Sequence, residues 1–486
     1  MPLNPLEVLN AMTSPLNPLQ VQIVNNLAVN AGDFGLSPSN TAAQNNTAMA
    51  NAFASVAAGG IVVVPFGAYR ISQSLIIDND NISLIGYGER GGAASFFIDP
   101  SADPAYALIV GNTKVVNNNL IQGLQFVGRN NTTSTGAGIL FRSNLGEIKQ
   151  CRVGLFGGLG ISVSPFSGAL VEVFFHDVNL LINGMNAGAH TLNLFIHGNV
   201  ADSEFHRVIA EGDISEAVTT TGIDCEGQLN KFIDCHCYYH SGNGMFVGGD
   251  RNQIVGGEYE TNGVYGIQSI GQKLSVIGVA GYGNGFADIK TTGSGIIADC
   301  NLQSVNNYNI VSTSANGGII ADNILSGATN AILLDAGSSG FRVHDNDISS
   351  TSDSIQIKAT NSSIHDNTVT QNIVEQTGAQ NNDIHDNHIA AGKTITIVGT
   401  QTKVRNNPGH NPKGGNIAPG VPASATPLTN TTGYDVTVFI SGGTLSNVSI
   451  GGVSTGGLST ESYRLPVGQT ITLTYTVAPT WTWFGD

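Results

Sequence analysis

The chain reads Val343-His344-Asp345-Asn346, then Ile364-His365-Asp366-Asn367, and then Ile384-His385-Asp386-Asn387. A fourth copy, Val404-Arg405-Asn406-Asn407, follows, and the last residues of the four copies lie 21, 20 and 20 positions apart. Repeats of this length are typical of solenoids, in which each turn stacks on the previous one and buries a shared core. The residues around the motif are β-branched and alternate in polarity, which indicates strands and turns and not helices. The repeat therefore predicts a parallel β-helix.

The same apolar frame continues toward the N-terminus and gives thirteen marks in all. The nine further marks are Leu124, Cys151, a looser match near His176, Arg207, Cys235, Gly257, Gly278, Cys300 and Asn323. Tight turns between short strands need residues that tolerate a positive φ, and the chain holds 62 glycines and many asparagines. Stacked asparagine side chains can also bond from one coil to the next, so this composition suits many short strands joined by turns.

The charge balance limits the class of ligand. The chain has 19 Lys plus Arg against 35 Asp plus Glu, for a net charge of −16. Nucleic acid needs a basic surface, so it is not an expected partner. The same balance disfavours a strongly polyanionic substrate and favours a neutral or weakly charged one. The N-terminal 32 residues show no secretory signal and no membrane-spanning run, which leaves an extracellular or virion-associated location open.

The pattern divides the chain into four predicted parts. Residues 1–60 form a leader and a capping helix, and 61–407 form the β-helix. A proline-rich linker covers 408–427, and 428–486 form a small antiparallel β domain. The five cysteines, 151, 225, 235, 237 and 300, lie mostly at inward positions, so we expect free, buried thiols.

The N-terminal cap carries a family resemblance. It begins at Asp33-Phe34-Gly35, continues through a helix containing Ala52 and Phe53 to Gly59-Gly60, and ends with the pattern Val-Val-Pro-x-Gly-x-Tyr at 63–69 and Ile-Gly-x-Gly at 85–88. This order resembles the pectate-lyase-like superfamily of right-handed parallel β-helix proteins, which includes phage tailspikes and polysaccharide depolymerases. The resemblance implies an all-β, right-handed parallel β-helix, a polysaccharide or oligosaccharide substrate and a homotrimer.

The spacing of the marks points to the site. The coils from Asn301 onward are short, whereas the intervals between about 151 and 257 grow to as many as 31 residues. Extra residues in a solenoid coil leave as loops on one face and wall a groove. The swollen segment also concentrates ionisable and aromatic side chains. We therefore expect the ligand site in this segment.

Alternation sorts these side chains into inward and outward sets. Along Ile233 to Tyr238, the isoleucine and both cysteines are expected to point inward, which turns Asp234, His236 and Tyr238 outward. Aligning Gly257 with Cys235 places Glu258 beside His236 and Glu260 beside Tyr238, about 4.8 Å away on the next strand.

Paired outward carboxylates predict glycosidic cleavage. One carboxylic acid protonates the leaving oxygen, and a second carboxylate activates water or attacks the anomeric carbon. Outward residues at i and i+2 lie roughly 6 to 7 Å apart. This separation is close to those of both retaining and inverting glycosidases. Our first choice is Glu258 with Glu260, and the second is Asp224 with Glu226. A third pair, Glu211 with Asp213, is placed among the substrate contacts. The other expected substrate contacts are His236, Tyr238, Arg207, Arg251 and Tyr259.

Other motifs are weaker. Cys235-His236-Cys237 has metal-like spacing, but inward thiols and an outward imidazole cannot converge on one ion, and the column of His344, His365 and His385 is expected to be a surface ladder. Trp481 and Trp483 would bind glycan or lock a subunit interface. No metal or cofactor is expected.

The preferred hypothesis is a glycoside hydrolase. A lyase or epimerase on uronic-acid polymers and a fructan transferase are the enzymatic alternatives. A glycan-binding spike or adhesin is the alternative without catalysis.

Overall fold

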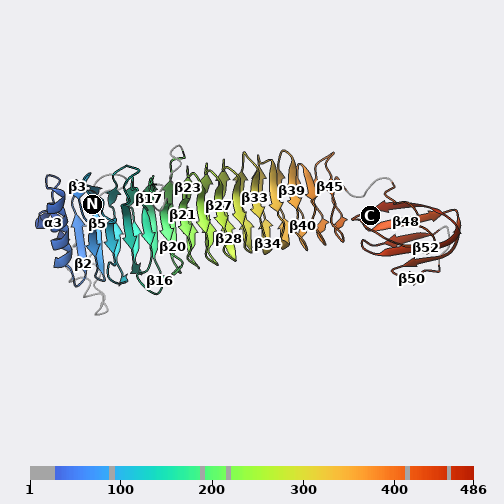
Figure 1. The fold of residues 1–486 in the computed structure, drawn as a ribbon, viewed down its shortest axis with the longest axis horizontal. Helices are drawn as coiled ribbons and strands as arrows, with labels where there is room; N and C mark the ends of the chain where they lie inside the picture. The colour runs from blue at the N-terminus through green and yellow to red at the C-terminus, as the bar shows by residue number, and fades with distance from the viewer. Residues whose placement is uncertain are drawn as a thin grey trace, which may run out of the picture. The chain divides into compact units, whose positions relative to one another are not determined.

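The computed structural model describes residues 28–86, 94–186, 192–214, 221–410, 416–456 and 461–485. The chain forms two compact units, residues 1–249 and 250–486, and each is described by itself. Both contain stacked parallel strands, and the second also contains antiparallel sheets, as Figure 1 shows. The predicted parallel β-helix with an N-terminal helix and a small C-terminal antiparallel region is confirmed.

One helix covers the first coils. The helix α3 (Ala42–Ser55) follows the 3-10 turn η1 (Ala31–Phe34) and packs against β3 (Gly67–Ile71) and β4 (Leu75–Ile77). Thr41 is its N-cap, and Gln44 completes a capping box. The helix contains Ala52 and Phe53 as expected, and the capping box fixes its first turn. Its buried side chains, among them Met49 and Phe53, close the end of the stack. The expected leader before residue 28 and the glycine at 88 lie outside the described residues.

The strands of the first unit stack in parallel with strict register. One sheet has the order β4, β7 (Tyr106–Val110), β11 (Ala137–Phe141), β15 (Ile161–Val163), β18 (Leu192–Ile196), β21 (Thr221–Cys225) and β24 (Asn243–Val247). The remaining strands are β1 (Ala28–Asn30), β2 (Gly60–Val64), β3, β5 (Ile82–Gly86), β6 (Ala94–Ile98), β8 (Val116–Asn117), β9 (Leu120–Gln122), β10 (Gln125–Val127), β12 (Ser143–Asn144), β13 (Glu147–Lys149), β14 (Arg152–Gly154), β16 (Leu170–Val171), β17 (Phe174–Leu181), β19 (Val200–Ala201), β20 (Glu204–Glu211), β22 (Lys231–Ile233) and β23 (His236–Tyr238).

The inward column of this unit corrects the predicted frame at two coils. The register places Val178 and Val208 in line with Leu124, Cys151 and Cys235, and all five are buried. The marks at His176 and Arg207 were therefore wrong by two residues and by one. The residue before each inward one is a turn with a positive φ, as at Asp177, Arg207 and Asp234. Sequence reading mistakes this turn residue for the core residue because both recur with the same period.

The turn at Asp234 also changes the predicted orientation of Ile233. Phe232 is buried and Ile233 is only half-buried, so Ile233 does not point inward as predicted. The left-handed residue Asp234 (φ 50) resets the alternation before Cys235. Cys235 and Cys237 are buried and His236 and Tyr238 are not, so the prediction for the rest of this segment is confirmed.

The second unit begins with the same type of coil. One sheet has the order β27 (Tyr265–Ser269), β30 (Ala287–Thr291), β33 (Tyr308–Ser312), β36 (Asn330–Leu334), β39 (Asp353–Ile357), β42 (Asn372–Glu375) and β45 (Ile395–Thr396). The other parallel strands are β25 (Gln253–Val255), β26 (Glu258–Glu260), β28 (Leu274–Ile277), β29 (Ala280–Tyr282), β31 (Gly295–Ala298), β32 (Asn301–Gln303), β34 (Asn316–Ala321), β35 (Ile324–Ser326), β37 (Ser339–His344), β38 (Asp347–Ser349), β40 (Ser363–His365), β41 (Thr368–Val369), β43 (Asp383–His385), β44 (His388–Ile389) and β46 (Lys403–Arg405). Here the mark at Gly278 was wrong by one, because Gly278 (φ 68) is the turn and Val279 is the buried residue.

An asparagine ladder runs along this unit. It consists of Asn323, Asn346, Asn367, Asn387 and Asn407, all buried. Each of the first four donates its side-chain amide to the Oδ1 of the next at 2.8 to 2.9 Å, and its backbone N–H bonds the same oxygen. These bonds satisfy polar groups that burial would otherwise leave without partners.

The C-terminal region is a pair of antiparallel sheets. One contains β47 (Pro427–Thr429), β52 (Thr470–Val477), β49 (Thr444–Ile450) and β50 (Val453–Ser454), and the other contains β51 (Ser462–Leu465), β48 (Val436–Ser441) and β53 (Thr480–Gly485). Trp481 and Trp483 are buried between them, 6% and 0% exposed, so neither ring is available to stack on a sugar or to form a subunit interface. Two residues of the predicted linker accept hydrogen bonds from these two tryptophans. The Pro419 carbonyl accepts one from the Trp481 indole N–H, and the Asn416 side-chain oxygen accepts one from the Trp483 backbone N–H. The domain boundaries at 60, 407 and 427 stay a prediction.

Candidate functional site

The strand β21 presents one predicted carboxylate pair on the outer face of its sheet. Ile223 and Cys225 are fully buried, so the alternation of the strand turns Asp224 outward. Glu226 follows one position beyond the strand, and its backbone N–H still continues the ladder by bonding the Ile196 carbonyl at 2.9 Å. Glu226 is exposed, whereas Asp224 is half-buried.

Two phenylalanines explain why Asp224 is half-buried. The register pairs Asp224 with Phe195 on β18 and with Phe246 on β24, so an aromatic side chain flanks the carboxyl on each neighbouring coil. The Asp224 Oδ1 atom is buried and has no hydrogen-bond partner among the described residues. Burial, with a smaller contribution from the Glu226 charge, raises the pKa of Asp224 from 3.8 to about 6.

This arrangement separates two chemical roles. Residues at i and i+2 of a strand are about 7 Å apart, which is within the range of paired carboxylates in glycosidases. Asp224 keeps its proton up to a pH near 6, so it can act as an acid. Glu226 is solvated and exposed. A carboxyl with a raised pKa beside a second, exposed carboxyl is an arrangement suited to acid–base catalysis.

A histidine lies beside this pair on the neighbouring coil. His197 follows β18 as Glu226 follows β21, and its ring contacts Phe195 with centroids 6.3 Å apart. His197 accepts a hydrogen bond at Nδ1 from the backbone of Asn199 at 3.2 Å. Sequence reasoning missed His197, Phe195 and Phe246. The signal that identifies them is the register with Asp224, which needs the turn residues to be assigned first.

The first-choice pair lies on a different sheet. Glu258 and Glu260 flank Tyr259 on β26, and they point outward because Tyr259 is buried. Glu258 is exposed and Glu260 is half-buried. Tyr259, 1% exposed, was expected to contact substrate, and its burial corrects this assignment. The expected placement of Glu258 and Glu260 beside His236 and Tyr238 stays a prediction.

The third pair and its neighbours lie at the end of β20. The Tyr238 hydroxyl donates a hydrogen bond to Glu211 at 3.2 Å, and the two residues are register partners. Asp213 is half-buried two residues farther on. Tyr238 also contacts the exposed ring of Tyr239 edge-on, at 5.3 Å. This group can hold a polar ligand, but Glu211 is already engaged by Tyr238.

The two predicted arginine contacts differ in their partners. Arg207 forms a two-point ion pair with Asp177 on the previous coil, at 2.6 and 3.0 Å. The hydrogen bond and charge of Asp177 raise the pKa of the Arg207 guanidinium. Arg251 is exposed in a left-handed turn, where its backbone N–H bonds Gln272. Arg207 therefore neutralises a neighbour in its own sheet.

The histidine column of the second unit is a stacked ladder. The rings of His344, His365 and His385 are nearly parallel, with centroids 5.0 Å apart. Each Nδ1 bonds the carboxylate of the next residue in the chain, at 2.7 to 2.8 Å. Within the described ranges, no group of three His, Cys, Asp or Glu side chains could hold a metal ion.

The cysteines are buried free thiols, as predicted. Burial raises the pKa of Cys151, Cys225 and Cys235 to about 12. A thiol with such a pKa is neither a nucleophile nor a metal ligand near neutral pH. In the described part of the chain, no helix has the length and apolar composition needed to cross a membrane.

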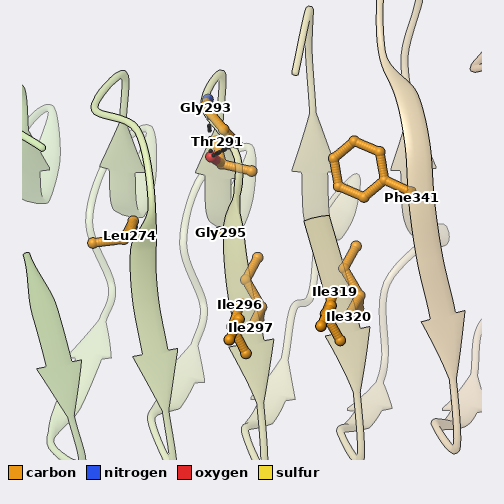
Figure 2. A pocket seen from close by; sticks show the side chains of 9 residues that line it. All are labelled: Leu274, Thr291, Gly293, Gly295, Ile296, Ile297, Ile319, Ile320 and Phe341. Carbon is orange, nitrogen blue, oxygen red and sulfur yellow. Dashed lines mark hydrogen bonds between the residues drawn. The ribbon is translucent and has the colours of Figure 1, made fainter. Parts of the chain in front are cut away.

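An apolar recess in the second unit offers no chemistry. Figure 2 shows that Phe341, Leu274 and the isoleucines of two adjacent strands line it. The recess lies where Gly295 and Gly318 replace larger residues in a column that also contains Leu274 and Phe341. None of its nine lining residues is ionisable.

The comparisons with known proteins found similar solved structures but no matching sequence. No family model and no curated protein sequence matches this chain. Among solved structures, the Dettilon tailspike protein has a TM-score of 0.49 at 13% identity, covering 95% of each chain. The A-module of Azotobacter vinelandii mannuronan C-5 epimerase AlgE4 has a TM-score of 0.48 at 18% identity, covering 77% of this chain and 99% of its own. The catalytic unit of a GH87 α-1,3-glucanase from Streptomyces thermodiastaticus has a TM-score of 0.46 at 14% identity, covering 79% of this chain and 68% of its own.

Proposed function

We propose that this chain binds a polysaccharide along the outer face of the β18, β21 and β24 strands and hydrolyses its glycosidic bonds. Asp224 is the general acid and Glu226 is the second carboxylate. The observation that supports this proposal is the buried Oδ1 of Asp224, which has no hydrogen-bond partner in the described part of the chain, beside an exposed Glu226. A carboxyl that keeps its proton near pH 6 can protonate a leaving alkoxide, which an ordinary surface aspartate cannot do.

The reaction divides between the two side chains. Asp224 donates its proton to the glycosidic oxygen as the bond to the anomeric carbon breaks. Glu226 either removes a proton from the attacking water or attacks the anomeric carbon itself. Phe195 and Phe246 exclude water from the acid, and their faces suit the apolar face of a sugar ring. The anomeric configuration of the first product, read by NMR, distinguishes the two roles of Glu226.

This proposal ranks Asp224 and Glu226 above Glu258 and Glu260. Both pairs have the required spacing along a strand, but only Asp224 combines half-burial with an oxygen that lacks a described partner. Glu258 is exposed to water, so no burial sets it apart from an ordinary surface carboxylate. The Glu258→Gln/Glu260→Gln variant should therefore keep most of the activity.

A panel of polysaccharides tests the reaction class. New reducing ends without ultraviolet absorbance support hydrolysis, whereas an unsaturated, absorbing product supports elimination. Asp224→Asn and Glu226→Gln should lower kcat while leaving the melting temperature unchanged. Glu172→Gln, which removes an exposed carboxylate from another coil, is the matched control. Full activity in Asp224→Asn would reject the assignment.

The second candidate function is glycan binding without cleavage. It is favoured by an aromatic group on the outer face of the second unit, in which Phe286 contacts Tyr265 and Tyr308 with centroids 5.7 and 5.6 Å apart. The Lys290 ammonium lies 5.0 Å from the centre of the Tyr265 ring. Binding of a polysaccharide with neither product signal would support this function. We also propose a homotrimer that acts outside the cell or on a virion, and sedimentation of the full chain tests the trimer.

A further inference from the structure

We infer that the substrate carries an isolated carboxylate, and that Arg142 binds it about three sugar residues away from the cleaved bond. The inference rests on the proposed function for the position of the cleaved bond, but not for the binding itself. It names a substrate class, a glycan in which acidic sugars are separated by neutral ones.

The first observation is a polar column that leads from Glu226 to Arg142. The residues that directly follow β21, β18, β15 and β11 are Glu226, His197, Ser164 and Arg142. The parallel register of the four strands keeps these residues in line. Backbone hydrogen bonds continue it, from Glu226 to Ile196, from His197 to Val163 and from Ser164 to Phe141. Neighbouring coils are about 4.8 Å apart, so Arg142 lies about 14 Å from Glu226. One coil is close to the length of one pyranose residue in an extended glycan.

The second observation is that the Arg142 side chain is fixed in place by the backbone. Its Nε donates to the Ser164 carbonyl at 3.1 Å, and its Nη1 donates to the Gly111 carbonyl at 3.3 Å. Gly111 (φ 79) allows this approach, because a Cβ there would lie 2.8 Å from the Arg142 Cβ. A guanidinium held this way keeps further N–H groups for a ligand and loses little side-chain entropy on binding.

The third observation concerns charge. Among the described residues no carboxylate forms an ion pair with Arg142, in contrast to Arg207, Arg405 and Arg464. Other described arginines also lack an ion pair, but Arg142 is the one whose guanidinium is held by backbone carbonyls. In a chain with nearly twice as many acidic as basic residues, a fixed arginine without an acidic partner is selective for an anion from outside. The net charge of −16 opposes a dense polyanion, which is why the inference specifies sparse carboxylates.

The surroundings of Arg142 suit a sugar ring as well as a carboxylate. Its guanidinium lies 5.4 Å from the centre of the Phe166 ring, which is 56% exposed. The Tyr106 hydroxyl bonds Ser162, and Arg142 lies close enough to act on the pKa of Tyr106, which burial raises. Tyr106 and Phe195 each pack against the buried cluster of Ala137, Leu159 and Leu192. An aromatic face, a hydroxyl and a fixed cation therefore share one part of the column.

The test measures binding, and it uses the full chain carrying Asp224→Asn to prevent cleavage. The probes are hyaluronan and gellan oligosaccharides, in which neutral sugars separate the acidic ones, and the same oligosaccharides with their carboxyl groups chemically reduced to alcohols. We expect at least one acidic form to bind ten-fold or more tightly than its reduced form. Adding Arg142→Gln should abolish that preference, and Arg142→Lys should restore part of it.

Arg152→Gln is the matched control, because it removes the same charge from β14 on another sheet. It should leave the preference intact. If Arg142→Gln lowers the melting temperature, the ratio of acidic to reduced affinity still decides, because misfolding lowers both affinities together. The inference is overturned if no acidic form binds better than its reduced form, or if the preference survives in Arg142→Gln. Failure of hydrolysis alone, with the preference intact, would reject the proposed reaction and leave this subsite standing.

Discussion

The asparagine ladder of the second unit and the outer face around Asp224 differ in whether their buried polar atoms are hydrogen-bonded. In the ladder, Asn367 accepts two hydrogen bonds from Asn346 and donates to Val343, His365 and Asn387. Around Asp224, a buried carboxylate oxygen has no described partner. In the ladder, the hydrogen bonds between polar groups stabilise the coils. On the outer face, the Oδ1 of Asp224 stays available to bond a ligand or the reacting glycosidic oxygen. The candidate site is therefore identified by the Asp224 oxygen that lacks a described partner, together with the raised pKa of Asp224 and the adjacent Glu226.

The largest expected effect tests the outer face. Asp224→Asn keeps the shape of the side chain and removes the proton donor, so kcat should fall by about 100-fold or more. The melting temperature should not fall, because an amide is easier to bury than a carboxylate. Reducing-end assays and calorimetry measure the two quantities. If the melting temperature falls together with kcat, Asp224 stabilises the fold, as the ladder asparagines do, and is not the acid.

The ladder should show the reverse pattern. Asn367→Ala removes the acceptor of two bonds from the buried Asn346, and should lower the free energy of unfolding by about 3 kcal/mol. Activity at a temperature well below the transition should be retained. Asp366→Asn is the matched control, because it changes the exposed neighbour to another residue that tolerates its positive φ. Equal destabilisation by both variants would remove the special role of the ladder.

Asp288 is a useful comparison with Asp224, because its buried carboxyl has hydrogen-bond donors for both oxygens. It accepts hydrogen bonds from Asn284 at 2.8 Å and from Asn309 at 3.2 Å, yet burial raises its pKa to about 6. Between pH 4 and 6 the folded state therefore holds a proton that the unfolded state releases, so stability falls as pH rises through this window. The change from this one group is about 3 kcal/mol. Asp288→Asn should flatten the dependence, and denaturant unfolding at several pH values measures it. An unchanged slope would exclude Asp288 as its source.

The smallest effect concerns the phenylalanines beside Asp224. Phe195→Ser admits water to the carboxyl, so its pKa should move back toward the ordinary value. The alkaline limb of the rate profile, near pH 6 in the wild type, should shift to lower pH in the variant. Phe166→Ser, on the same face but beside Arg142, is the control and should leave that limb in place. If both variants shift it equally, Phe195 does not set the pKa.

The fold could be predicted from the sequence because its signal is periodic. The motif around Asn346, Asn367 and Asn387 gives the coil length, and the pattern that contains Ala52 and Phe53 indicates the helix α3. The phase of each coil could be predicted less well. A left-handed turn residue such as Arg207 or Gly278 recurs with the same period as the core, and it moved the predicted frame by one.

The candidate site could be predicted only in part, for the same reason. The alternation around Ile223 and Cys225 was sufficient to turn Asp224 outward, but not to rank it above Glu258. Its ranking depends on Phe195 and Phe246, which are 29 and 22 positions away and become neighbours only through the register of the coils. Arg142 lies outside the swollen segment, so loop length gave no signal for it.

Direct titration of the Asp224 carboxyl tests the central claim. The measurement is the carboxyl ¹³C shift of labelled aspartate in the wild type, assigned by comparison with Asp224→Asn and followed from pH 3 to 8. A midpoint near 6 is the predicted result. A midpoint near the ordinary value of 3.8 would contradict the account, because Asp224 would then be ionised wherever the enzyme works and could not serve as its acid.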